Sequence, residues 1–354
     1  MQTLTRYLLS LICLLFVACS SSEETPAPPP APASSSFYVV NQGSYYDGID
    51  GSISSVNAET GEVVSDAFMA KNGVSLGGSP QAGCQWGDYI YIPAIESNRV
   101  WALGADDLSV VGTITTNVPT AVEATSDYLF VTNNDGYLSV YNRADLSLVK
   151  QIEVGPNPCS MTISDGELFI SISDGYNYPT YENGYRLARL SLADLSLGES
   201  ISVGMNPGQL LTAADGSLIV VCLGDYGMTP STVYKVDPKA GTSTYLCNGS
   251  FIATQGEKLL VINAVTDWST YETINTYDAY DVRTGNLLKS NILQDPLPAM
   301  PIAIQCAPNG DILITSQLSL YDYTSPGMLY HYDAEGNYKA QYSVGVSPCG
   351  VFVK

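Results

Sequence analysis

The chain repeats itself at regular intervals, and most of the repeats carry a proline at the same place. The anchor prolines are Pro80, Pro119, Pro158, Pro207, Pro301 and Pro348, separated by 39, 39, 49, 94 and 47 residues. The interval of 94 residues holds two repeats, divided near Asn248-Gly249. A repeat of this length supplies one supersecondary unit that buries its apolar surface against the neighbouring units. The fold is therefore expected to be an array of equivalent units.

Each repeat consists of short β-strands, and a tight turn recurs between two of them. The strand segments are rich in Val, Ile, Leu, Thr and Tyr, and helix signals are nearly absent. The turn is built from Asp, Asn, Gly and Ser, which favour tight connections. It occurs seven times, starting at Asn57, Gly104, Asn142, Ser191, Asp237, Asp281 and Asp333. These observations predict an all-β fold, a seven-bladed β-propeller formed by residues 37–354.

The two ends of this domain are expected to share one blade. The chain stops six residues after Pro348 with the strand-like "CGVFVK", and the domain begins with "FYVVNQ" at Phe37. In the other repeats, a strand that resembles "GVFVK" is followed by a strand that resembles "FYVVNQ". We therefore expect an innermost strand from the C-terminus and three strands from the N-terminus. Closure of this kind removes the free sheet edges that promote aggregation.

One set of loops is long and rich in aromatic residues. In a propeller, the loops between second and third strands lie on the same face as the crossovers between blades. Five of these loops are long and aromatic, including "DGYNYPTYENGY" at Asp174–Tyr185, whereas the opposite turns are short and plain. Long loops on a rigid scaffold commonly carry function, which predicts a ligand-binding rim. Its candidate residues are Tyr45, Tyr46, Asn134, Asp135, Tyr176, Tyr178, Tyr181, Tyr185, Tyr226, Trp268, Tyr271, Tyr321 and Tyr323. The alternative is that the rings pack on their own loops.

The sequence lacks the usual patterns of catalytic and metal-binding sites. His331 is the single histidine and lies in an alternating strand segment, where we expect a buried, hydrogen-bonded ring. No Ser-His-Asp set, histidine cluster or CxxC pair is present, so we expect neither an enzyme, a metal site nor a bound cofactor. Carboxylate pairs such as Asp47 and Asp50 could bind calcium or act as acid and base. They are expected to be solvated turn residues.

Six cysteines lie within the predicted propeller. They are Cys84, Cys159, Cys222, Cys247, Cys306 and Cys349. An exported protein permits disulfides, and six cysteines allow fifteen complete pairings. Four of the six follow an anchor proline within five residues, on expected inner strands. Disulfide bridges and buried free thiols both remain open at this point.

The N-terminus resembles the leader of a bacterial lipoprotein. Arg6 precedes the ten-residue apolar run Leu8–Val17, which is too short to span a bilayer of about 30 Å. Ala18 and Cys19 follow at the position of a lipobox. The resemblance implies a signal peptide at residues 1–18, lipidation at Cys19 and a lipidated, Ser/Pro-rich linker at residues 19–36. An ordinary signal peptide with a coincidental cysteine is the alternative.

Charge limits the partners of the exported domain. The chain has 35 acidic and 14 basic residues, a formal net charge of −21. Nucleic acid is therefore an unsuitable partner, because phosphate binding needs a basic patch. The acidic run after Cys19, residues 20–24, resembles the signals that direct some lipoproteins to the cell surface.

The repeat itself resembles a known family. Residues Tyr128–Pro158, "YLFVTNNDGYLSVYNRADLSLVKQIEVGPNP", resemble the YVTN (YncE-type) β-propeller repeat. Together with the leader, the chain resembles the BtuG type of seven-bladed surface lipoproteins, which capture cobalamin (vitamin B12) for a TonB-dependent outer-membrane transporter. The resemblance implies a transported corrinoid ligand, a transporter partner, and attachment to the outer membrane through a lipid anchor, exposed at the cell surface. A glycan-binding or other surface recognition propeller is the main alternative, and a propeller lyase or lactonase is a third.

Overall fold

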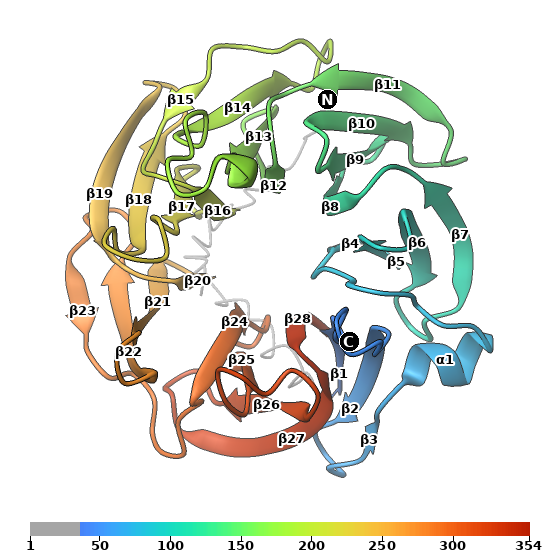
Figure 1. The fold of residues 1–354 in the computed structure, drawn as a ribbon, viewed down its shortest axis with the longest axis vertical. Coiled ribbons are helices and arrows are strands. Elements are labelled where there is room, and N and C mark those ends of the chain that lie inside the picture. Colours follow the sequence, from blue (N-terminus) through green and yellow to red (C-terminus); the bar gives the residue numbers. More distant parts are fainter. Residues whose placement is uncertain (1–35) are drawn as a thin grey trace, which may run out of the picture. The chain divides into compact units, whose positions relative to one another are not determined.

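Seven four-stranded antiparallel sheets are arranged as blades around a central axis in the computed structural model, which describes residues 36–354 (Figure 1). From the axis outward, blade 1 comprises β28 (Pro348–Val353), β1 (Ser36–Asn41), β2 (Ser52–Asn57) and β3 (Val63–Val64); blade 2 comprises β4 (Cys84–Trp86), β5 (Tyr89–Ala94), β6 (Arg99–Gly104) and β7 (Val110–Thr115). Blade 3 comprises β8 (Pro119–Ala124), β9 (Tyr128–Asn133), β10 (Tyr137–Asn142) and β11 (Leu148–Glu153); blade 4 comprises β12 (Pro158–Ser164), β13 (Glu167–Ile172), β14 (Arg186–Ser191) and β15 (Ile201–Ser202).

The remaining three blades follow the same order. Blade 5 comprises β16 (Pro207–Thr212), β17 (Leu218–Cys222), β18 (Thr232–Asp237) and β19 (Thr242–Asn248). Blade 6 comprises β20 (Phe251–Gln255), β21 (Lys258–Asp267), β22 (Glu272–Asp281) and β23 (Leu287–Lys289). Blade 7 comprises β24 (Met300–Cys306), β25 (Ile312–Gln317), β26 (Pro326–Tyr332) and β27 (Tyr338–Val346). The predicted fold class is confirmed.

The ring closes in blade 1 as expected. β28 is the innermost strand and pairs antiparallel with β1, with Phe37 opposite Val353 and Val40 opposite Gly350. The main-chain N–H of Lys354 donates to the carbonyl of Ser36 at 2.9 Å. The last strand of the chain therefore completes a sheet that the first strands begin.

Helical structure is limited to two short segments in the described residues. α1 (Ala67–Asn72) lies between β3 and β4, and η1 (Gly175–Asn177) is a single 3₁₀ turn in a loop. α1 was not predicted from the sequence, although Asp66 caps its first turn and Gly73 ends it in the left-handed conformation. Neither helix is long and apolar enough to cross a membrane.

The hydrophobic core is divided into seven clusters that lie between neighbouring blades. In one of them Tyr91 and Val100 of blade 2 pack against Leu129 and Val131 of blade 3. Second strands such as β9 are buried on both sides, because each blade is covered by a neighbour on either side. These strands are therefore continuously apolar and do not alternate, unlike the half-exposed strands of an open sheet.

The anchor prolines mark a repeated contact at the crossovers between blades. In five blades the preceding residue has a positive φ, between 41° and 55°: Ser79, Val118, Asn157, Asn206 and Ser347. In each case its carbonyl accepts the N–H of the first residue after the second strand of that blade, at 2.9–3.3 Å. Asparagine tolerates this left-handed conformation, which gives a physical reason for Asn-Pro at two of the five positions.

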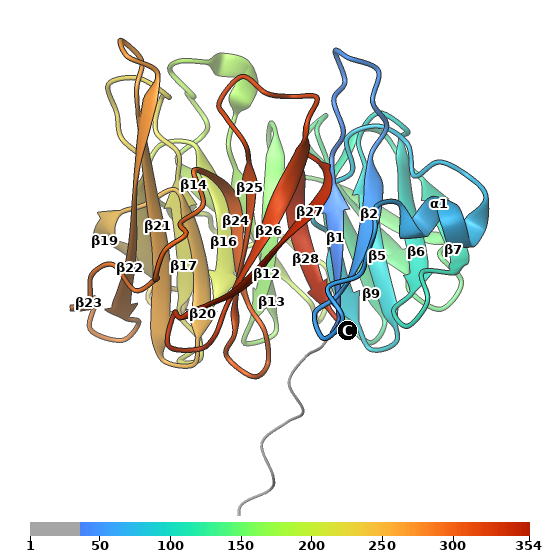
Figure 2. The same cartoon turned by 90° about the horizontal axis from the view of Figure 1, so that it is seen from below.

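Strand direction assigns the connections to two faces of the ring (Figure 2). The loop face carries the crossovers and the seven loops between second and third strands: 42–51, 95–98, 134–136, 173–185, 223–231, 268–271 and 318–325. The turn face carries the seven tight turns between third and fourth strands. Ser36 and Lys354 also lie at the turn face, so the described chain enters and leaves the ring opposite to the long loops.

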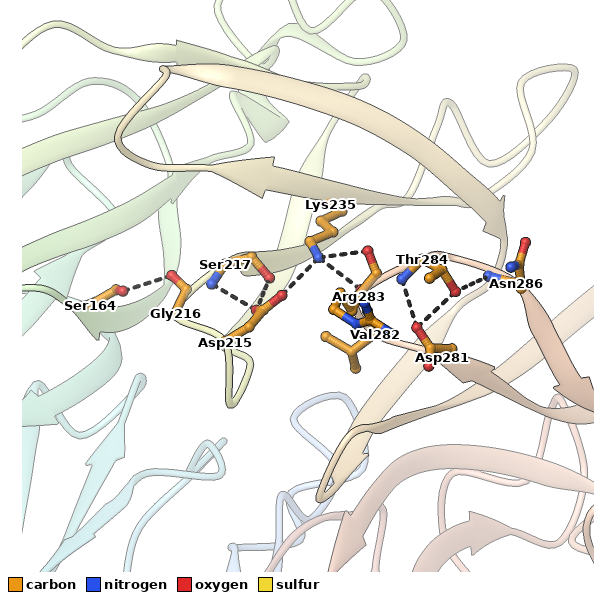
Figure 3. A network of polar contacts seen from close by, with 10 residues as sticks. All are labelled: Ser164, Asp215, Gly216, Ser217, Lys235, Asp281, Val282, Arg283, Thr284 and Asn286. Atoms are coloured by element: carbon orange, nitrogen blue, oxygen red, sulfur yellow. Dashed lines mark hydrogen bonds and ion pairs between the residues drawn. The ribbon is translucent and has the colours of Figure 1, made fainter.

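Polar contacts on the turn face connect three blades (Figure 3). The Nζ of Lys235 in blade 5 lies 2.9 Å from the Asp215 carboxylate and donates at 2.9 Å to the carbonyl of Val282 in blade 6. The hydroxyl of Ser164 in blade 4 donates to the carbonyl of Gly216 at 2.8 Å. Burial opposes ionisation of Asp215, but hydrogen bonds from Lys235 and its neighbours outweigh it and lower its pKa to about 2. This network connects blades 4, 5 and 6 on the turn face and involves no residue of the loop face.

The cysteines of the described part of the chain are all free thiols. This decides between the two alternatives left open by the sequence. Burial raises the pKa of four of these thiols to about 12: Cys159, Cys222, Cys306 and Cys349. These side chains are therefore protonated and unreactive at neutral pH.

His331 has the buried, hydrogen-bonded role expected from the sequence. Its Nε2 lies 2.6 Å from a carboxylate oxygen of Asp311, which also accepts a hydrogen bond from Lys339 at 2.8 Å. Burial lowers the pKa of His331, so the ring is neutral at pH 7. The group lies at the turn-face ends of β25 and β26, away from the long loops.

Glu123 predicts a measurable pH dependence of stability. It is the one Asp or Glu on the seven innermost strands, and burial raises its pKa above the ordinary value of 4.5. Because the folded state favours the protonated form, ionised Glu123 destabilises the fold near neutral pH. Glu123→Gln should therefore raise the melting temperature by a few degrees at pH 7–8, and this gain should shrink as the pH falls toward 4.5. Thermal melts at a series of pH values measure the difference.

The matched control is Glu59→Gln, which alters an exposed carboxylate in a tight turn. Its melting temperature should follow that of the wild-type protein at every pH. A Glu123→Gln protein that is no more stable than wild type at pH 8, or equally stabilised at pH 4.5 and pH 8, contradicts the prediction.

Candidate ligand-binding face

The thirteen residues predicted to form the rim are distributed over six of the seven loops of the loop face. They include Tyr45 and Tyr46 in blade 1 and the tyrosines of residues 174–185 in blade 4. Most of these aromatic residues are exposed, with relative accessible surface from 38% at Tyr185 to 96% at Tyr46. Exposed aromatic surface of this amount on one face is unusual for an isolated soluble domain and is typical of a recognition surface.

Tyr181 is the exception, and its assignment as a ligand-facing residue is corrected here. It is only 2% exposed and is among the largest fully buried side chains of the protein. Its ring packs edge-on against Tyr178, with centroids 6.0 Å apart. Tyr181 therefore stabilises its own loop, which is the alternative role considered for these rings. The other tyrosines of the loop are exposed on its surface.

Asp174 makes hydrogen bonds in the interior of the same loop. Its carboxylate is fully buried and accepts hydrogen bonds from the side chain of Asn177 at 2.9 Å and from the main-chain N–H of Asn183 at 2.7 Å. Its φ of 52° is left-handed, which Asp tolerates better than most residues. This interior contact lets a loop without strand or extended helix keep one conformation.

Polar side chains cover the part of the loop face over blades 2 to 4. Asn134 donates to the hydroxyl of Tyr176 at 2.7 Å and accepts a hydrogen bond from Asn157. Asn117 donates to the Asp135 carboxylate at 2.7 Å. This region offers amide and hydroxyl groups to a ligand, and it fixes the position of Tyr176 at the border of the fourth blade.

A cavity of about 400 Å³ lies on the loop face at the junction of blades 5, 6 and 7. Its walls come from the loops 223–231 and 318–325 and from the long hairpin of β21 and β22. The hairpin extends beyond the rest of the ring (Figure 2). β21 pairs with β20 only as far as Ile262, opposite Phe251, but continues to pair with β22 as far as Asp267. The inner edge of β21 beyond Ile262 is left without a strand partner and forms one wall of the cavity.

The blade beside this cavity is also the one whose repeat lacks an anchor proline. The chain enters it through Gly249 and Ser250, and the Ser250 hydroxyl lies 3.2 Å from both the N–H and the carbonyl oxygen of Ala264. This contact replaces the crossover hydrogen bond found in five other blades. The absence of the proline was visible in the sequence, but the cavity was not.

The cavity combines aromatic walls with polar groups at its base. Three predicted rim residues line it, Tyr226, Trp268 and Tyr323. The sequence interpretation missed further lining residues: Met228, Phe251, Asn263, Val265, Thr266, Gln317 and Leu320. Met228, 95% exposed within the loop "GDYGMTPS", was the clearest available signal, since a large apolar side chain is costly at a loop tip.

Two ring pairs extend the aromatic surface beyond the cavity. Tyr271 at the hairpin tip packs edge-on against Tyr321 of blade 7, with centroids 5.6 Å apart. Tyr45 and Tyr46 form a similar pair over blade 1, with centroids 5.2 Å apart. Such edge contacts favour a defined ring orientation.

The two carboxylates of the first loop, Asp47 and Asp50, each accept a hydrogen bond from a serine hydroxyl. Asp47 accepts a hydrogen bond from Ser44 at 2.5 Å, and Asp50 accepts one from Ser75 at 2.6 Å. Among residues 36–354, no group of three or more His, Cys, Asp or Glu side chains is placed to hold a metal ion. The arrangement on this face is suited to binding through rings, amides and hydroxyls. That the protein is not an enzyme remains a prediction.

Comparisons with known proteins identify the architecture. No family model matches the chain, and no curated protein sequence is significantly similar to it. A quinonprotein alcohol dehydrogenase-like protein from Bacteroides thetaiotaomicron superposes with a TM-score of 0.65 at 13% identity, covering 90% of this chain and 78% of that one. The chain has a β-propeller fold. Hydrazine synthase of Kuenenia stuttgartiensis (TM-score 0.56, 16% identity, 70% and 74% coverage) and the Pan2 WD40 domain of Neurospora crassa (0.56, 9%, 77% and 81%) are also similar. At these identities the likeness shows the fold alone.

Proposed function

We propose that this protein is a lipid-anchored surface receptor that binds a corrinoid, with cobalamin as the ligand to test first, and delivers it to a TonB-dependent outer-membrane transporter. The observation that carries the proposal is the one-sided distribution of exposed rings over the loop face, three of which line a cavity of about 400 Å³. The lipoprotein leader and the YVTN-type repeat add the cellular setting and the class of ligand by resemblance.

The exposed rings of the loop face supply enough apolar area to bind a large amphipathic ligand. If about five rings each bury about 100 Å² on the ligand, roughly 12 kcal/mol of gross stabilisation follows at ~25 cal/mol per Å². Ordering of the ligand and of the loops reduces this value, and the remainder supports tight binding. We expect the amide of Asn134 and the hydroxyl of Tyr176, which hydrogen bond to each other, to meet carboxamide groups at the edge of a corrin.

The entry point of the chain supports the same arrangement. β1 begins at the turn face, so a tether that joins the domain there leaves the loop face free. This arrangement suits a receptor that collects a ligand from the surroundings.

Co-elution of cobalamin tests the proposed ligand. The purified domain, mixed with cobalamin and passed through a size-exclusion column, should carry red absorbance in the protein peak. The Tyr176→Ala/Tyr178→Ala variant should fold normally, because both rings are exposed, and should bind at least tenfold more weakly. Tyr89→Ala/Tyr245→Ala, which removes two exposed tyrosines outside the loop face, is the control. A folded domain without red absorbance overturns the corrinoid proposal, and retention on a glycan array would then favour the glycan-binding alternative.

Membrane attachment has a separate test, because Cys19 lies outside the described residues. Cys19→Ala should release the protein from the membrane fraction of expressing cells, and labelled palmitate should enter the wild-type protein but not the variant. The propeller should fold equally well in both, since the leader precedes the first strand. Wild-type protein that never incorporates palmitate contradicts lipid anchoring.

A further inference from the structure

Three successive blades present the same pair of residues around the cavity. Asp225-Tyr226, Asp267-Trp268 and Asp322-Tyr323 each occur in a loop between the second and third strand of its blade or at its edge. The aromatic member of every pair lines the cavity and is about half exposed. Three aspartates therefore directly precede, in the chain, three rings that line the cavity, although the aspartates themselves are not part of its lining.

The three aspartates make the same local hydrogen bond. The Oδ1 of each accepts the main-chain N–H of the residue two positions later: Gly227 at 2.9 Å, Ser269 at 2.8 Å and Thr324 at 3.3 Å. This turn fixes the backbone on both sides of the intervening aromatic residue. One residue type thus both orients the ring and contributes negative charge. Hydrogen bonds to main-chain and serine groups also hold the pKa of these carboxyls below the ordinary range, so they are ionised at neutral pH.

Positive charge is absent from the same segments. Residues 223–231, 248–251, 263–273, 300–302 and 317–323 surround the cavity and contain no Lys, Arg or His, whereas Glu272 adds a fourth carboxylate. An anionic group in this cavity would meet uncompensated repulsion. A cation would meet the negative faces of the rings and the polarisable side chain of Met228, and the carboxylates of the surrounding segments would attract it without contacting it.

We propose that the cavity at the junction of blades 5, 6 and 7 binds an organic cation with an apolar body, such as a quaternary ammonium compound. The rings of Tyr226, Trp268 and Tyr323 contact the apolar body and the cation, and the adjacent aspartates provide the complementary charge. The ammonium group needs no hydrogen-bond acceptor, which suits aspartates whose oxygens already accept hydrogen bonds in their turns. This site does not depend on corrinoid binding, and it remains testable if cobalamin does not bind.

The first experiment compares three probes of similar size that differ in charge. Benzyltrimethylammonium, benzyl alcohol and benzoate are titrated into the purified propeller, with isothermal calorimetry and tryptophan fluorescence as readouts. We expect the cation to bind at least tenfold more tightly than the alcohol, and benzoate not to bind. Trp268→Ala should weaken binding of the cation at least tenfold. Trp86→Ala, which removes an exposed ring at the end of β4 on the turn face, should leave the affinity unchanged.

The second experiment separates local charge from the charge of the whole protein. Asp225→Asn/Asp267→Asn/Asp322→Asn removes three charges but keeps an oxygen that can accept each turn hydrogen bond. The control, Asp145→Asn/Asp194→Asn/Asp237→Asn, removes three charges from turns of the same type on the turn face. Only the first variant should lose cation affinity, by about tenfold, while its affinity for benzyl alcohol stays unchanged.

Three results would overturn the proposal. The first is equal affinity for the cation and the alcohol, and the second is the absence of binding to the folded wild-type protein. The third is an equal loss in the two triple variants, which would assign the attraction to the overall charge of −21. Circular dichroism and the melting temperature of each variant establish that it is folded.

Discussion

Deletion of the last six residues, Cys349–Lys354, should abolish stable folding of the whole ring. The segment supplies most of the innermost strand of blade 1, and its removal exposes the inner edge of β1 from Phe37 to Val40. Val351 and Phe352 are buried, and each contributes about 1.5–3 kcal/mol through burial alone. Loss of the strand pairing adds to this cost, and the sum approaches the 5–15 kcal/mol that keeps a typical domain folded. Thermal and guanidinium melts of the truncated protein measure the effect.

Removal of Lys354 alone is the appropriate control for this deletion. This residue lies beyond β28 and is exposed, and its N–H makes one hydrogen bond to Ser36. The shorter deletion should therefore lower the melting temperature only slightly. If the six-residue deletion melts at the wild-type temperature, ring closure by the C-terminal strand does not hold the domain together.

Replacing Tyr181 with Ala should destabilise the protein by about 3 kcal/mol, because it empties a fully enclosed aromatic site. For a domain of this size, we expect the melting temperature to fall by roughly 5 °C or more. The loop 173–185 should also become a preferred site of proteolysis, since Tyr181 and Asp174 are its main interior contacts. Differential scanning calorimetry and limited chymotrypsin digestion provide the two measurements.

Tyr181→Phe tests whether packing is responsible. The ring volume is retained, so this variant should melt close to wild type. The Tyr176→Ala/Tyr178→Ala variant should also melt normally, because these rings are exposed. A stable Tyr181→Ala protein that has lost ligand binding would instead assign Tyr181 to the ligand site.

The sequence predicted the blade count and the closure of the ring for a local reason. Each repeat carries its own strand and turn signals, such as the Asp turns at Asn142 and Ser191, and these act over a few residues. The missing anchor proline between Pro207 and Pro301 did not obscure the count, because two turns, at Asp237 and Asp281, lie between these prolines and indicate two blades. The assignment of the aromatic loops to one face followed from strand direction alone.

The sequence could not predict which of the aromatic side chains are exposed. Tyr176, Tyr178 and Tyr181 occur within six residues and look equivalent, yet one is buried and two are exposed. The folded loop encloses Tyr181 together with the Asp174 carboxylate, which accepts hydrogen bonds from Asn177 and Asn183, and no local sequence pattern indicates this closure. The free thiols are a similar case, because disulfide formation depends on distances between blades.

The sequence by itself therefore determined the repeating unit, the number of units and their order, since these depend on interactions between residues close in the chain. Only the tertiary structure decided where the cavity lies and which side chains line it. The rings of Tyr226, Trp268 and Tyr323 are separated by more than forty residues in the sequence and line one cavity in space. They meet because ring geometry brings the loops of neighbouring blades together and because the β21–β22 hairpin extends beyond its inner strand partner.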